Sequence, residues 1–144
     1  SNIAECYLDL GNKDEALKFF KEAYNIEKKN NNYDGICYTS SEIAEILIIN
    51  KPSKALTFLK EAKKSAEFLN KSSYIIESSV KLGDYYYNLP DILDLCLKEY
   101  LTALRTAINS AESIDLSKIE KRIQDMKLRM DKSKFKDIEK KYGR

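Results

Sequence analysis

Small and large apolar residues recur along this chain with the spacing of one face of an α-helix. In three stretches a small residue is followed by a bulky apolar residue four positions later and by alanine seven positions later, and all three positions share a helical face. Small side chains on that face let a second helix approach closely. A face repeated at a fixed period predicts a helical solenoid. The stretches are Ala16, Phe20 and Ala23, then Ala55, Leu59 and Ala62, then Cys96, Tyr100 and Ala103.

Turn residues between these stretches divide the first 112 residues into helix pairs. Gly11 follows the last apolar residue of a helix, as at many helix C-termini. Asn12 with Glu15 forms a capping box for the next helix. Pro52 and Pro90 stand where proline is tolerated, in the first turn of a helix. We therefore expect helices over about residues 3–10, 12–28, 33–49, 52–69, 73–88 and 90–112.

The helix pairs resemble those of tetratricopeptide-repeat proteins. In that family the first helix of each unit carries a small residue with a large apolar or aromatic residue three positions later, and the second helix carries the small, bulky, alanine pattern. Ala16, Ala55 and Cys96 lie 39 and 41 residues apart, which exceeds the standard repeat of about 34 residues. The resemblance is therefore to the long-repeat kind. The first-helix matches are Ala4 and Tyr7, Ala44 and Leu47, and Gly83 and Tyr86.

This resemblance implies an all-α fold, a right-handed superhelical solenoid of three antiparallel hairpins over residues 1–112. The first hairpin is expected to be truncated at its N-terminus, because the chain opens inside a helical pattern without an initiator Met. The related helical solenoids of the HEAT type are the alternative architecture. The resemblance also implies a cytoplasmic protein-interaction scaffold, and long-repeat members often serve as regulatory or sensor modules of larger bacterial signalling proteins, which is the alternative function.

Residues 113–144 break the repeat and change the charge. Apolar residues at steps of three and four predict one amphipathic capping helix, with Asp115 as its N-cap. A short basic helix is expected over 134–142. Residues 1–116 carry a net charge of −4 and residues 117–144 a net charge of +6. Interspersed acids favour a solvated helix face, or a linker into another domain, over nucleic-acid binding. The apolar stripe is Leu116, Ile119, Ile123, Met126 and Met130, with Lys118, Lys121, Arg122, Asp125 and Arg129 expected outside.

Composition argues against catalysis. The chain has no histidine, which removes Ser–His and Cys–His catalysis and the commonest metal ligand. Cys6, Cys37 and Cys96 lack metal-ligand spacing and are expected to be small core residues in a reducing compartment. No nucleophile motif or phosphate-binding loop is present, and no apolar run is long enough to span a membrane. We expect no enzyme, no catalytic residue, no metal, no cofactor and no membrane or nucleic-acid partner.

A row of acids is the candidate binding feature. In tetratricopeptide proteins the first helix of each unit lines the concave groove, and the residue after its small residue points inward. Here that residue is Glu5, Glu45 or Asp84. An acidic wall disfavours a carboxylate-terminated peptide, so we expect a neutral or basic peptide or protein, or further repeats or domains of the same chain. The alternative is that these acids are ordinary solvent-facing positions. The remaining candidates are Asp9, Tyr38, Ile48, Tyr87 and Asn88, with Tyr38, Ile48 and Tyr87 as apolar anchors.

Overall fold

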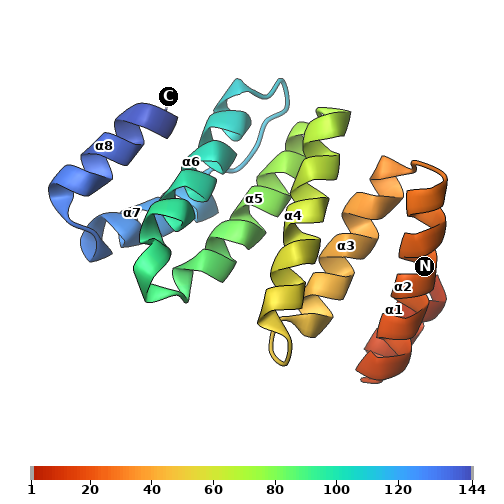
Figure 1. Ribbon diagram of the computed structural model, residues 1–144. Helices are drawn as coiled ribbons and strands as arrows, with labels where there is room; N and C mark the ends of the chain where they lie inside the picture. Colours follow the sequence, from red (N-terminus) through yellow and green to blue (C-terminus); the bar gives the residue numbers. More distant parts are fainter. Residues whose placement is uncertain (1, 144) are drawn as a thin grey trace. The chain divides into compact units, whose positions relative to one another are not determined.

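The computed structural model describes residues 2–143, and within that range the chain forms α-helices, one 3-10 turn and no strand. Figure 1 shows these helices along the chain. The all-α class expected from the sequence is confirmed. The chain divides into two compact units, residues 1–70 and 71–144. Among residues 2–143, no helix combines the length and apolar character needed to cross a membrane.

Unit 1 consists of two helix pairs. The second helix, α2, packs against both α1 and α3, and α3 packs most extensively against α4. Short turns join the helices, so each runs antiparallel to the one before it and α1 and α3 run in the same direction (Figure 1). The helices are α1 (Asn2–Asp9), α2 (Lys13–Lys29), α3 (Tyr33–Leu47) and α4 (Pro52–Leu69).

Asparagine and glycine fix the helix ends in unit 1. The side chain of Asn12 accepts a hydrogen bond from the backbone N–H of Glu15 at 3.2 Å, which confirms the predicted cap. Asn32 caps α3 in the same way by accepting from the N–H of Gly35 at 3.1 Å. Gly11 has a φ of +77°, a left-handed conformation that glycine adopts without steric cost, so α1 ends there and the chain turns into α2.

The repeated small and bulky residues form the core of unit 1. Ala4, Ala16 and Phe20 are fully buried, as are Ala44 and Ala55. These positions therefore belong to the interior of unit 1, which packs closely as protein interiors do. The sequence pattern identified these core positions correctly.

Unit 2 contains the third helix pair and two further helices. The strongest packing is between α5 and α6, and both α7 and α8 rest on α6. Gly83 of α5 directly faces the ring of Tyr100, which is 1% exposed. The predicted apolar stripe of the C-terminal region is confirmed at Ile119, Ile123, Met126 and Met130, which are buried, whereas Leu116 is half-buried. The elements are α5 (Ser72–Tyr87), η1 (Pro90–Ile92), α6 (Leu93–Asn109), α7 (Ser117–Arg129) and α8 (Lys132–Tyr142).

Several predicted boundaries in unit 2 were wrong. Pro90 does not open the long helix but a 3-10 turn over Pro90–Ile92, and α6 begins only at Leu93. Leu89 before the proline is extended, as residues preceding proline usually are. The helix ends at Asn109 rather than at residue 112, because Ser110 is also extended. Asp115 is not the N-cap of α7. Leu116 takes that position, although the carboxylate of Asp115 accepts from the N–H of Ser117 at 3.0 Å.

The cysteines divide between core and surface. Cys37 and Cys96 are buried, as predicted. Burial raises the pKa of the Cys96 thiol to about 11. Cys6 is exposed, which corrects the expectation that all three are core residues. It lies two positions after Ala4, the buried residue of α1, and helix residues two apart do not share a face.

Candidate partner-binding surfaces

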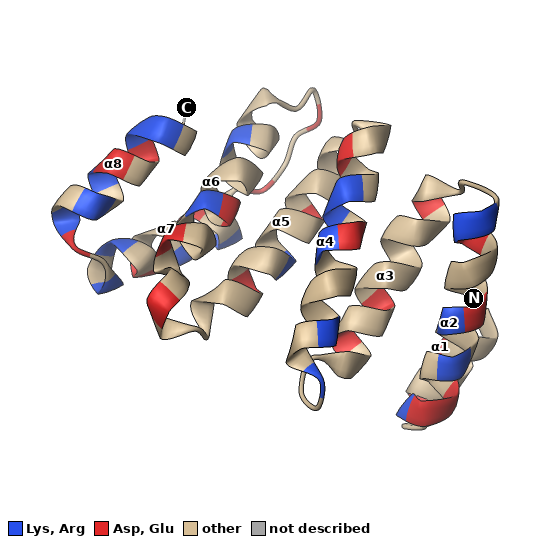
Figure 2. Ribbon diagram, viewed as in Figure 1, with Lys and Arg blue, Asp and Glu red and all other residues tan. Residues whose placement is uncertain are grey.

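The two helices of unit 1 that hold the predicted acids carry charge of one sign. α1 and α3 together contain five carboxylates and no lysine or arginine, whereas α2 and α4 contain nine lysines and six carboxylates. Figure 2 shows acidic residues alone on α3 and residues of both signs on α2 and α4. Three of the carboxylates, Glu5, Asp9 and Glu45, are exposed. The helices α1 and α3 thus carry an unbroken negative charge, which we call the acidic face, formed by Glu5, Asp9, Asp34, Glu42 and Glu45.

Tyr38 links the two helices of the acidic face. Its hydroxyl donates a hydrogen bond to the carboxylate of Glu5, and its ring lies edge-on to Phe20, with 6.1 Å between ring centroids. Burial and the hydrogen bond to Glu5 raise the pKa of the Tyr38 hydroxyl. Tyr38 as a whole is still 38% exposed. Tyr38 is therefore held in place by its neighbours while part of its aromatic surface faces solvent.

Apolar side chains are exposed at the C-terminal ends of α1 and α3. Ile48 is 38% exposed and Ile49 is 76% exposed, and Leu10 at the end of α1 is 79% exposed. Because α1 and α3 run in the same direction, these residues lie toward the same end of unit 1. Exposed apolar residues beside charged ones are a common composition for a protein-binding surface.

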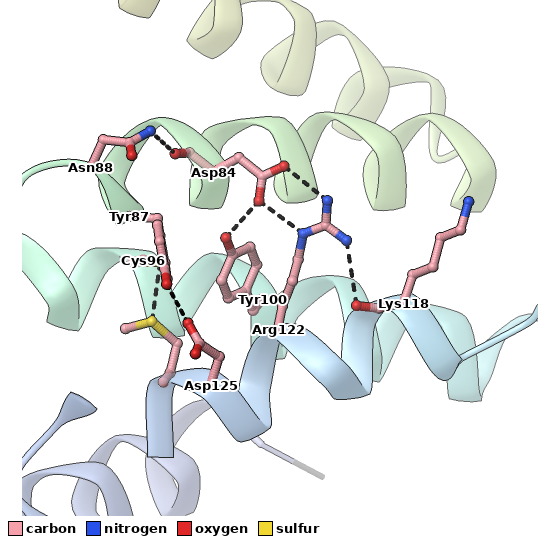
Figure 3. Close-up of polar contacts among 9 residues, drawn as sticks. Asp84, Tyr87, Asn88, Cys96, Tyr100, Lys118, Arg122 and Asp125 are labelled. Carbon is pink, nitrogen blue, oxygen red and sulfur yellow. Dashed lines mark hydrogen bonds and ion pairs between the residues drawn. The ribbon is translucent and has the colours of Figure 1, made fainter. Parts of the chain in front are cut away.

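In unit 2 the predicted acid Asp84 is engaged by its own chain. Arg122 of α7 binds the carboxylate of Asp84 with both arms, from Nε to Oδ1 at 2.8 Å and from Nη2 to Oδ2 at 3.0 Å. The hydroxyl of Tyr100 donates to Oδ1 at 2.5 Å. Figure 3 shows the three side chains meeting between α5, α6 and α7. The prediction that Arg122 lies on the outer side of α7 is wrong, because its guanidinium reaches across to Asp84 of α5.

The other two predicted residues of unit 2 are also engaged. The hydroxyl of Tyr87 donates to Asp125 of α7, and the guanidinium carbon of Arg129 lies 4.2 Å from the centre of the Tyr87 ring. Asn88 donates through Nδ2 to the backbone carbonyl of Asp84 at 3.2 Å. Asp84 and Tyr87 therefore face α7 in the folded unit, and Tyr87 holds a cation instead of standing as an open apolar anchor.

A pocket of about 510 Å³ lies where α7 meets α5 and α6. Tyrosines form part of its wall, and charged residues of both signs line the rest. Most of the charged residues come from α7, so the charge around Asp84 differs from that of the acidic face. The lining residues are Asp84, Tyr87, Tyr100, Lys118, Lys121, Arg122 and Asp125.

A stripe of long polar side chains along α7 is a sequence signal for this site. Lys118, Arg122, Asp125 and Arg129 recur at steps of four, three and four, so they form one stripe along α7. The stripe lies beside the buried apolar residues of the same helix. Long polar side chains at the border of a buried face often reach back onto the neighbouring helix.

The Asp84 cluster leads to a prediction about alkaline stability. Burial and the hydrogen bond to Asp84 raise the pKa of Tyr100 above its ordinary value of 10.0. Above about pH 10 the unfolded chain releases this proton while the folded chain retains it, so stability falls as the pH rises. Tyr100→Phe should lower the unfolding free energy at pH 7 by about 1 kcal/mol but flatten its decline above pH 10. Urea titrations at pH 7 to 11 measure both effects, and an unchanged alkaline slope would contradict this role of the Tyr100 hydroxyl.

Comparisons with protein-family models, with curated protein sequences and with solved structures found no match to this chain.

Proposed function

We propose that this protein is an interaction module whose acidic face in unit 1 binds a neutral or basic segment of a partner protein. The observation that carries the proposal is the charge of α1 and α3, five carboxylates without a single lysine or arginine. A surface of one sign steers partners of the opposite sign and disfavours like-charged ones. The resemblance to tetratricopeptide repeats supports the same kind of function, and the right-handed superhelix and cytoplasmic location that it implies stay predictions.

The contacts within unit 1 give the acidic face a defined shape. Tyr38 is fixed between Phe20 and Glu5, so a partner need not order this side chain when it binds, and that lowers the entropic cost of association. Ile48 offers an apolar contact beside the charges. A segment with lysine or arginine next to aliphatic residues fits this combination, whereas a terminal carboxylate would meet repulsion from Glu5, Asp9 and Glu45.

Charge reversal on the acidic face tests the proposal. Fluorescence anisotropy would compare labelled peptide pools in which leucine alternates with lysine, glutamate or serine. The lysine pool is expected to bind best, and Glu45→Lys should weaken its binding about tenfold, a loss of about 1.4 kcal/mol.

Glu67→Lys is the matched control, because Glu67 is an exposed glutamate on α4 of the same unit. It makes the same change in net charge away from α1 and α3. If Glu45→Lys and Glu67→Lys weakened binding of the lysine pool equally, the effect would come from net charge alone, which would contradict a specific role of the acidic face. Binding that neither substitution changes, or preferential binding of the glutamate pool, would contradict the proposal.

A further inference from the structure

The pocket of unit 2 differs from the acidic face because cationic side chains line it beside its two carboxylates. Asp84 accepts hydrogen bonds from both arms of Arg122 and from Tyr100. Asp125 accepts from Tyr87. Arg122 neutralises Asp84, whereas Asp125 keeps its negative charge, and the three cations that line the pocket outnumber these two acids.

The unused donors of the pocket are cationic. The ammonium groups of Lys118 and Lys121 form no hydrogen bond or ion pair with any other residue in the range 2–143, although Lys118 has an electrostatic interaction with Asp115. Arg122 uses three of the five N–H groups of its guanidinium, two on Asp84 and one on the backbone carbonyl of Lys118 at 3.3 Å. Two further N–H groups of Arg122 therefore stay available beside the two lysines.

These donors are held close together by α7. Lys118 and Arg122 are four residues apart and Lys121 is three residues after Lys118, so all three lie on neighbouring positions of the helix surface. Arg122 is fixed by its two bonds to Asp84, as Figure 3 shows. A guanidinium fixed in this way is suited to recognise an oxyanion, because its planar N–H groups match carboxylate and phosphate oxygens.

We propose that the pocket between α5, α6 and α7 binds a small multivalent oxyanion, a molecule with two or more phosphate or carboxylate groups. The volume of about 510 Å³ falls within the range of small-molecule sites. One anionic group contacts Arg122 and Lys118, and a second contacts Lys121. The tyrosine walls, Tyr87 and Tyr100, leave room for a short apolar part of the ligand. The size of the pocket favours a small molecule over an acidic peptide.

Calorimetric titration with defined probes at constant ionic strength tests this site. Pyrophosphate and citrate represent the two oxyanion sources, and a hexaglutamate peptide represents the acidic peptide. Saturable binding of pyrophosphate or citrate with a Kd below about 1 mM is expected, and the stronger of the two identifies the source. The double variant Lys118→Gln/Lys121→Gln should weaken this binding at least about tenfold. Amide chemical shifts in α5 and α7 should change on saturation.

Lys127→Gln is the matched control, since Lys127 is an exposed lysine of α7 outside the pocket. It should change the Kd less than about twofold. Circular dichroism and urea denaturation verify that all variants are folded. No saturable binding of either small anion, binding of hexaglutamate alone, or equal loss in the Lys127→Gln variant would each overturn the proposal. Glu45→Lys should leave pyrophosphate binding unchanged, so failure of this site and failure of the acidic face are distinguishable.

Discussion

Replacing Gly83 with alanine is expected to lower the free energy of unfolding by about 1–3 kcal/mol, the usual result of forcing extra volume into a packed interior. A Cβ at this position would lie 2.6 Å from Cδ1 of Tyr100 and closer still to Cε1. Tyr100 is 1% exposed, and its ring cannot turn aside without losing the hydrogen bond to Asp84. Urea denaturation followed by circular dichroism measures the loss.

A loss of stability in Gly83→Ala would be informative, because alanine forms helices better than glycine and would otherwise stabilise α5. In an exposed helix interior the same substitution stabilises by about 1 kcal/mol. Gly35→Ala is the control: its Cβ would lie 2.6 Å from Cδ of Glu27, the far end of a flexible side chain. Glu27 can move at the cost of its hydrogen bond from Thr39, so we expect a loss below about 1 kcal/mol. Stability equal to wild type in Gly83→Ala would contradict the close packing of α5 on α6.

Replacing Phe20 with alanine is expected to cause the largest loss, about 3–5 kcal/mol, because a fully buried aromatic side chain is removed and a cavity is left behind. Phe20 is 0% exposed and belongs to the core of unit 1. Its ring also supports Tyr38. The milder Phe20→Leu keeps the protein folded, and it should weaken binding of the lysine peptide pool by loosening Tyr38. Urea denaturation and anisotropy give the two readouts.

Phe19→Ala is the matched comparison at the neighbouring position. Phe19 is half-buried and stacks on Tyr7, with 5.5 Å between ring centroids. It should lose clearly less stability than Phe20→Ala, since less apolar area leaves water in the folded state. If Phe19→Ala lowered the unfolding free energy as much as Phe20→Ala, this would contradict the assignment of Phe20 to the buried face of α2.

The two proposed surfaces recognise opposite charge. The acidic face of unit 1 lies on helices without a basic residue, whereas the pocket of unit 2 takes its unused cations from α7. Charge substitutions in one unit should therefore leave binding to the other unchanged apart from a small long-range effect that salt screens. This separation lets each binding proposal be tested in the intact protein.

Helix positions and the buried face could be predicted from the sequence because both depend on local order. Apolar spacing close to the helical period identified Phe20 and Tyr100 as core residues, and both are buried. Cap and turn residues such as Asn12 and Gly11 fix the backbone only a few positions away in the sequence. The errors at Pro90 and Asp115 were also local, by a turn or less, because several nearby residues can satisfy the free N–H groups of a helix start.

The charge environment of the candidate residues was decided by tertiary structure. The same pattern, an acid after the small residue of a helix, occurs at Glu45 on the all-acidic helix α3 and at Asp84, which lies beside the cations of α7. Nothing in the sequence near Asp84 announces Arg122, which lies 38 residues away and reaches it only because α7 packs on α6. Periodicity determines which face of a helix is buried. Which charges meet across helices depends on how those faces pack. The sequence therefore determined the helices and the core, while only the fold distinguished the charge environments of the two proposed binding surfaces.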